Sequence, residues 1–488
     1  MNRIFTLLML PSLAALSACM VGPDFEKPEF DSPAGWNGAK DSGVLAQNPK
    51  GYSQRDLVEW WRLFGDDVLC GLIDKAVAKN FSLETARAKV EQARATLGIH
   101  RSGLWPSLDA DASFKEGAKP LTSSTSESYR AGATAAWEID VFGGTRRSIE
   151  SAAADYKAAM ADEVAVRVKV AADVAQAYFK YRSYQIRLRI TRENLTAQLK
   201  TYEITKQRKA NGFVSQLDVV RAAAEVSSTN AQLPQIEMNE RLALNALELL
   251  VGVQNGELDS LLAAEKPLPK LESFVPAGVP AELLRRRPDI IVAEHKIHSA
   301  VAAVGEAKAG FYPKFSITGT ISYDAPRIGN MFNSAYGSWS VGPTMQWNIF
   351  QAGKTVNSVK LKEAVVKEAN VSWREKVYTA IKEVEDALVS AAKERERIEL
   401  MNTLVSDNQK AFELSKKLYA AGEIEFLDLL VAQRSLLSSQ QNQVESRMKF
   451  VNYVVALYKS LGGGWQSDLD SSGSSSGEDS LERTREIL

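Results

Sequence analysis

Residues 129–160 read YRAGATAAWEIDVFGGTRRSIESAAADYKAAM, and the spacing of their apolar side chains changes at the glycine pair 143–144. Over residues 129–141 apolar side chains alternate with mostly polar or small ones, which is the period of a strand whose two faces meet different surroundings. Over residues 149–160 apolar side chains recur every three or four positions, as in a helix. The sequence therefore predicts an amphipathic strand that leads directly into a helix.

Three further segments have the same alternation, namely residues 108–115, 315–323 and 339–349. Strands of a soluble sandwich also alternate. A length of about ten residues, aromatic side chains near the strand ends and polar connections instead favour a transmembrane barrel. The connections 116–127 and 324–338 are then expected to be extracellular loops.

Four strands cannot form a closed barrel, and lipid does not tolerate an open sheet edge. The chain is therefore expected to oligomerise. Two copies would give about eight strands with a lumen filled by side chains, whereas three would give about twelve and could enclose water. The polar face of the strands favours three copies.

Two very long helices are expected over residues 145–210 and 354–421, because neither range contains a proline or a glycine. At 1.5 Å per residue each would extend roughly 100 Å. Shorter helices are expected over residues 68–102 and 215–251, with counterparts in the second half of the chain. A cytoskeletal coiled coil would also have long helices, but it has no use for amphipathic strands between them.

Matched landmarks indicate that the chain contains one unit twice. The motif around Gly103-Leu104-Trp105-Pro106 recurs as Gly310-Phe311-Tyr312-Pro313, and Leu217-Asp218 recurs as Leu427-Asp428. The offset is about 207 to 210 positions throughout, so few insertions separate the copies.

The N-terminus resembles a secretion signal. Arg3 precedes an apolar run over residues 4–15, which is too short to span a bilayer. The run ends in Leu16-Ser17-Ala18-Cys19, which resembles a bacterial lipoprotein box. Cleavage before Cys19 would leave this cysteine to carry a covalent lipid; ordinary signal cleavage beside an incidental cysteine is the alternative.

Taken together, these features resemble the outer membrane factor family, the TolC-like exit ducts, and in particular the lipoprotein branch that serves multidrug efflux pumps of the resistance-nodulation-division type. The motifs that carry the resemblance are Val21-Gly22-Pro23-Asp24, Trp60-Trp61, Glu138-Ile139-Asp140-Val141-Phe142-Gly143, Arg286-Arg287-Pro288-Asp289-Ile290 and Leu461-Gly462-Gly463-Gly464-Trp465.

The resemblance implies an α+β membrane protein that forms a homotrimer. Its twelve-stranded transmembrane β-barrel would continue into a periplasmic helical barrel with a mixed equatorial domain. The implied location is the outer membrane, anchored by the lipid on Cys19 and extending into the periplasm. The implied partners are a periplasmic adaptor (a membrane fusion protein), an inner-membrane pump and outer membrane lipid.

The expected organisation follows from the repeat and the resemblance. It comprises a signal peptide (1–18), a lipidated and partly equatorial segment (19–66), repeat 1 (67–253), an equatorial linker (254–280), repeat 2 (281–462) and a tail (463–488).

Each repeat contains a helix-to-helix turn that matches the periplasmic tips of the family. The residues expected to contact the adaptor are Gly212, Phe213, Val214 and Ser215 in the first turn and Gly422, Glu423, Ile424 and Glu425 in the second. The glycines would supply the positive φ that ends each helix. Leu427 and Asp428 match positions where relatives narrow the closed end, so they are the expected periplasmic gate. The alternative role for Asp428, and for Asp218, is to favour the positive end of its own helix.

Other function classes find little support in the sequence. A net charge of −1 argues against a nucleic-acid partner. His295 and His298 could share a helix face, but no cysteine or acidic cluster completes a metal site. No phosphate-binding loop or catalytic constellation is recognisable, so neither enzyme activity nor a cofactor is expected. A protein-secretion exit duct and a stand-alone porin are the alternatives to drug efflux, although a porin needs no long helices.

Overall fold

The structure is a computed structural model that describes residues 20–31, 35–36, 57–119, 124–269 and 286–465. The chain divides into two compact units. The sheet unit comprises Met1–Phe30, Ala88–Ala161 and Ile290–Lys376, and the helical unit comprises Asp31–Arg87, Asp162–Asp289 and Val377–Leu488.

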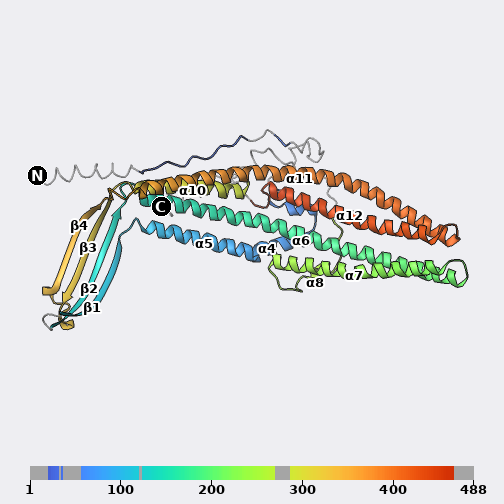
Figure 1. Cartoon of the computed structure of the whole chain (residues 1–488), viewed down its shortest axis with the longest axis horizontal. Coiled ribbons are helices and arrows are strands. Elements are labelled where there is room, and N and C mark those ends of the chain that lie inside the picture. Colours follow the sequence, from blue (N-terminus) through green and yellow to red (C-terminus); the bar gives the residue numbers. More distant parts are fainter. Residues whose placement is uncertain (1–19, 32–34, 37–56, 120–123, 270–285, 466–488) are drawn as a thin grey trace. The chain divides into compact units, whose positions relative to one another are not determined.

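Helices account for most of the described residues. In the first half the elements are η3 (Trp60–Phe64), α4 (Asp67–Lys79), α5 (Phe81–Ser102), β1 (Ser107–Lys119), β2 (Ser124–Ile139), α6 (Gly144–Ala210), α7 (Gln216–Val251) and α8 (Asp259–Leu262). In the second half they are α10 (Pro288–Ala309), β3 (Lys314–Ala325), η4 (Ile328–Asn330), η5 (Ser334–Tyr336), β4 (Gly337–Gln346), α11 (Lys354–Ala421) and α12 (Phe426–Ser460) (Figure 1). Among the described residues, none of the helices combines the length and the hydropathy needed to cross a bilayer.

The four strands form one antiparallel sheet in the order β1-β2-β3-β4 (Figure 1). Hydroxyl groups bridge neighbouring strands on its polar face, where Thr320 and Ser340 are 2.8 Å apart. The opposite face carries large apolar side chains that no described residue covers, since Leu108 and Trp339 are each 76% exposed. The alternation expected from the sequence thus gives a sheet with one apolar and one polar face.

The strand ends differ from the prediction. The loop expected over residues 116–127 is largely strand, because β1 continues to Lys119 and β2 begins at Ser124, with Glu116 opposite Glu127. Ladder hydrogen bonds join backbone groups and do not require apolar side chains, so a polar segment can extend the hairpin. In contrast, β4 ends at Gln346, before the expected end of its strand at residue 349.

Corresponding tryptophans close the base of each strand pair. The indole Nε1 of Trp137 donates to the Leu104 carbonyl at 2.9 Å, and that of Trp347 donates to the Phe311 carbonyl at 3.0 Å. In each hairpin, the bond joins the region where the second strand ends to the turn that precedes the first strand. The two halves of the chain therefore use the same contact at matching positions.

The first helix of repeat 1 was expected to be continuous over residues 68–102, and this is wrong. Asn80 separates α4 from α5 because its backbone is extended, with ψ of 128°. Its side-chain Oδ1 accepts hydrogen bonds from the backbone N–H groups of Ser82 and Leu83, at 2.9 and 3.2 Å, and so caps α5. Its Nδ2 donates to the Leu250 carbonyl at 2.7 Å, which fixes the break against the end of α7.

A buried polar network holds the segment around residue 66 and the segment after α8 against α6. Asp66 accepts hydrogen bonds from the Tyr178 hydroxyl at 2.5 Å and from Lys266 at 2.8 Å. Partial burial alone would raise the pKa of Asp66, but these two donors hold it below its usual value. Arg182, almost fully buried, donates to the carbonyl of Ala264 at 2.6 Å.

Candidate functional site at the two interhelical turns

Two turns join the long helices of the helical unit. We call residues 209–215 tip 1 and residues 419–425 tip 2. Gly212 has φ of +78° and Gly422 has φ of +84°. The N–H groups that follow return to the preceding helix, with Phe213 bonded to the Arg208 carbonyl and Glu423 to the Leu418 carbonyl, each at 2.9 Å. Glycine ends both helices in the left-handed conformation that other residues rarely adopt.

Tip 1 leads into α7 through a complete capping box. The Ser215 hydroxyl accepts from the Asp218 backbone N–H at 3.2 Å, and the Asp218 carboxylate accepts from the Ser215 backbone N–H at 3.1 Å. Arg221 lies 3.8 Å from the same carboxylate. Asp218 is thus engaged in starting its own helix, the role that the sequence offered as its alternative.

Tip 2 leads into α12 without such a cap. Glu425 occupies the position that Ser215 holds in tip 1, and its side chain makes no capping hydrogen bond. Within the described part of the chain, Asp428 has no hydrogen-bond or ion-pair partner, and both Leu427 and Asp428 are exposed. The two residues expected to form the gate are therefore free to face solvent or another copy.

The two tips are joined through Tyr419. Arg208 donates to the Tyr419 carbonyl, and its guanidinium carbon lies 4.8 Å from the centre of the Tyr419 ring. The Tyr419 hydroxyl is 3.2 Å from the Thr205 hydroxyl. The ring itself is buried in an apolar cluster with Phe426 and Leu430. Since Thr205 and Arg208 belong to α6, these contacts tie tip 2 to the helix that precedes tip 1.

A second link joins the helices that follow the tips. Arg434 of α12 contacts a carboxylate oxygen of Glu225 on α7 through Nε at 2.7 Å and Nη2 at 2.5 Å. The Glu225 side chain is only 8% exposed, whereas that of Arg434 is 60% exposed. A buried carboxylate is thus neutralised by a cation that reaches in from the surface.

The sequence profile of the family described as outer membrane efflux protein matches residues 72–253 and 279–463. The chain belongs to this family. It is an outer membrane channel component of an efflux pump, and the outer membrane is its location. The two matched segments cover most of both halves of the chain and include both tips.

Individual relatives match over nearly the whole chain. The solvent efflux pump outer membrane protein SrpC of Pseudomonas putida is 33% identical over 471 residues, which are 94% of this chain and 98% of that protein. Outer membrane protein OprJ of Pseudomonas aeruginosa is 30% identical, over 92% of this chain and 94% of that protein. The solved structure of the outer-membrane channel OprN shares 31% sequence identity at a TM-score of 0.82, and the match covers 92% of this chain and all of that one.

In this efflux protein the proposed lipid site, Cys19, lies outside the described residues, and so do the signal segment before it and the tail after residue 465. The segment that follows Cys19 is held by Arg147, whose side chain is 2% exposed. The guanidinium donates to the Val21 carbonyl at 3.2 Å and to Asp24 at 2.8 Å. The chain just after the expected lipid is therefore fastened to the start of α6.

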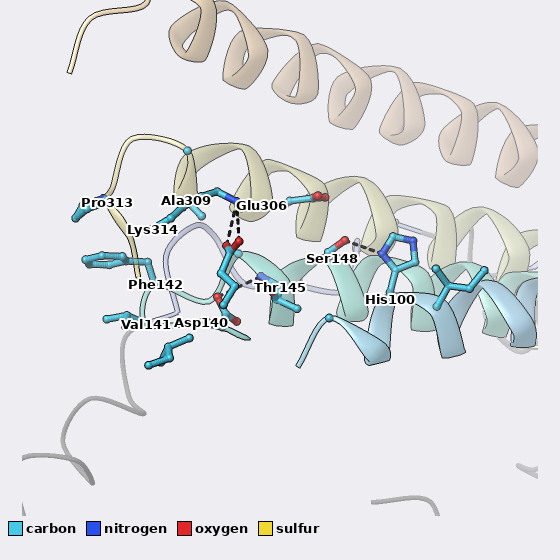
Figure 2. Close-up of a pocket in the computed structure, with 16 residues that line it drawn as sticks. His100, Asp140, Val141, Phe142, Thr145, Ser148, Glu306, Ala309, Pro313 and Lys314 are labelled. Atoms are coloured by element: carbon cyan, nitrogen blue, oxygen red, sulfur yellow. Dashed lines mark hydrogen bonds and ion pairs between the residues drawn. The ribbon is translucent and has the colours of Figure 1, made fainter. Parts of the chain in front are cut away.

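A pocket of about 440 Å³ lies in the sheet unit where β2 gives way to α6 (Figure 2). Several of its polar groups are hydrogen-bonded to one another. His100 Nδ1 is 2.8 Å from the Ser148 hydroxyl, Lys314 donates to Glu138 at 3.0 Å, and Asp140 accepts from the Thr145 N–H at 3.2 Å. These contacts hold together the ends of several helices and strands, so the polar groups of the pocket have a structural role.

The histidines considered as metal ligands have other surroundings. His298 is 2.9 Å from Glu150 and stacks on Phe25 with ring centres 4.4 Å apart. Burial lowers the pKa of His295, which favours its neutral form. Among the described residues no group of three or more histidine, cysteine or acidic side chains is placed to hold a metal ion.

The sequence indicated the tip residues but not the contacts between the tips. Gly212 and Gly422 were identifiable from their place at the end of uninterrupted helices. The links from Arg208 to Tyr419 and from Glu225 to Arg434 join residues more than two hundred positions apart. The spacing of apolar residues along the sequence gives no information about contacts between residues so far apart.

Proposed function

We propose that three copies of this chain form a passive exit duct, with a closed twelve-stranded barrel in the outer membrane and a helical tunnel below it. The duct would carry drugs or other small toxic compounds that a periplasmic adaptor and an inner-membrane transporter of the resistance-nodulation-division type deliver. The observation that carries the proposal is the four-stranded sheet, in which β1 and β4 each have one edge without a strand partner among the described residues.

The open edges suit a ring of identical copies. Neighbouring strands of the sheet are antiparallel, so β1 and β4 run in opposite directions. If β4 of one copy lies beside β1 of the next, that pair is also antiparallel and the same contact repeats around a closed ring. Three copies supply twelve strands, enough for a water-filled lumen lined by the polar face.

The helical unit supports the same arrangement. Helix α7 exposes apolar side chains along one face, and so does α11. On α7 they are Leu217, Val220, Met238, Leu242 and Leu249; on α11 they are Tyr378, Val389, Leu400 and Leu414. Rows of exposed apolar side chains of this length, on a surface that would otherwise face water, indicate a protein–protein interface. A neighbouring copy that joins its α11 to this α7 would cover both rows.

The remaining assignments belong to the same proposal. Lipid on Cys19 would anchor the chain, with Arg147 fastening the segment that follows. The residues Gly212 to Ser215 and Gly422 to Glu425 would contact the adaptor, and Leu427 with Asp428 would narrow the periplasmic end. Three copies of the exposed Asp428 around the axis would favour cations at this constriction. The family profile matches a segment in each half of the chain, which supports matched roles for the two turns.

The test combines assembly with transport. The mass of the purified protein should equal that of three chains, and expression in a strain lacking its own outer membrane component should restore drug resistance only together with an adaptor and a proton-driven pump. Resistance restored only beside an ATP-driven exporter of proteins would favour the secretion duct. Passive solute uptake without any partner would favour a porin.

A further inference from the structure

A cavity of the helical unit lies beside tip 2, among α6, α11 and α12. Its volume is about 260 Å³. Apolar side chains form much of its wall, with Ala197 and Ile204 from α6, Phe412 and Tyr419 from α11, and Leu429 from α12. Phe412, Tyr419 and Leu429 belong to the buried cluster that underlies tip 2, so this side of the cavity is built on a packed core.

Two lysines border the cavity without a counter-charge. Lys200 of α6 and Lys416 of α11 are both exposed, and neither has an ion pair or hydrogen bond with any described residue. Other lysines on the same helices are paired, since Lys206 lies 3.3 Å from Glu203 and Lys410 lies 3.2 Å from Asp407. The cavity therefore has two unpaired ammonium groups at its border.

The other polar groups of the lining are already engaged. The carboxylate of Glu193 accepts from Arg189 at 2.9 Å. The hydroxyls of Thr196 and Thr201 donate to the carbonyls one turn earlier on α6, at 2.9 and 3.0 Å. The cavity thus offers a ligand an apolar wall and two free cations.

We infer that this cavity binds a single-chain anionic amphiphile, with its hydrocarbon tail against the apolar wall and its carboxylate or sulfate between Lys200 and Lys416. A ligand with a cationic head would be repelled by both lysines, and an uncharged tail alone would use neither. The volume is below the roughly 300–1,000 Å³ of drug-sized sites, which suits a narrow tail better than a multi-ring compound. The inference goes beyond the proposed function, because it requires neither transport nor an adaptor.

The test measures binding of dansyl-labelled undecanoate to the full chain purified in a non-ionic detergent, by the rise in dansyl fluorescence. We expect saturable binding, and at least tenfold weaker binding to the double variant Lys200→Gln/Lys416→Gln, because charge-assisted contacts to the head group are lost. The matched control Lys206→Gln/Lys410→Gln removes two lysines from the same helices outside the cavity. It should bind within about twofold of the unchanged protein, since exposed pairs contribute little.

Three further measurements test the chemical class of the ligand and the location of its binding site. The methyl ester of the probe should bind at least tenfold more weakly, unlabelled decanoate should displace the probe, and Ile204→Ala should weaken binding several-fold by removing part of the apolar wall. Equal binding by the ester, or equal loss in both double-lysine variants, would overturn the inference. Displacement by diacyl phosphatidylglycerol but not by decanoate would overturn the single-chain assignment.

Discussion

Tip 1 and tip 2 each contain a glycine at the matching position, and an aspartate follows each tip three residues after its end, yet the two aspartates differ in their contacts. Asp218 is engaged in a capping box with Ser215. Asp428 has no partner among the described residues, because Glu425 stands where a serine would cap the helix and makes no capping bond. The residue at the helix start thus differs between the two tips, and so do the contacts of the carboxylate three positions later, which is part of a capping box after tip 1 and has no hydrogen-bond partner among the described residues after tip 2.

The largest effect should come from the turn glycines. Gly212→Leu and Gly422→Leu are each expected to abolish efflux while trimers remain in the membrane, because a side chain in the left-handed conformation costs about 1–2 kcal/mol and reshapes the turn. Drug resistance and the amount of trimer in outer membranes are the measurements. Unchanged resistance in both variants would remove the tips from adaptor contact.

Alanine at the same positions should separate the tips. A Cβ at Gly422 would come within 3.1 Å of the Arg208 guanidinium, whereas a Cβ at Gly212 would meet nothing within 4 Å. Gly422→Ala should therefore disturb the link to Tyr419 and lower resistance more than Gly212→Ala does. Equal resistance in the two alanine variants would show that the link has no bearing on transport.

The pair that joins the helices after the tips should have the next largest effect. Arg434→Met leaves the buried carboxylate of Glu225 without its partner, which should cost about 1–3 kcal/mol of stability. Glu225→Gln keeps an uncharged acceptor for Arg434 and should cost less. The midpoint of thermal unfolding of the purified trimer measures both, and a smaller shift for Arg434→Met than for Glu225→Gln would contradict the argument.

The positions of the tips were predictable because regular patterns and special residues mark them. Strand alternation, proline-free runs and two glycines identify the strands, α6, α11 and both turns. The break at Asn80 was not predictable, because a side-chain amide that caps one helix and bonds the Leu250 carbonyl depends on a contact far along the chain. The strand over residues 116–119 was missed because its ladder is formed by the backbone, while its side chains are those of a loop.

The aspartates themselves give the fourth test of the comparison. Asp218→Ala should lower stability by about 1 kcal/mol, through loss of the capping box, and leave ion selectivity unchanged. Asp428→Ala should have the opposite pattern, with lower cation selectivity or a higher leak conductance and little change in stability. Reversal potentials in planar bilayers and thermal unfolding measure the two properties, and identical single-channel behaviour of Asp428→Ala would remove Asp428 from the gate.

The smallest and sharpest test converts tip 2 into tip 1. Glu425→Ser places a serine three residues before Asp428, which recreates the spacing of Ser215 and Asp218 and should stabilise the start of α12 by about 0.5–1 kcal/mol. The same change draws the Asp428 carboxylate back toward the backbone N–H of residue 425, so cation selectivity should fall toward that of Asp428→Ala.

Glu425→Ala is the matched control, because it removes the same negative charge without supplying a cap. If cation selectivity falls only in Glu425→Ser, the changed position of the Asp428 carboxylate is the cause. If both variants lose cation selectivity equally, the charge of Glu425 itself contributes to the selectivity of the constriction. The functional difference between the tips then comes from the number of acidic side chains in each and not from the capping box.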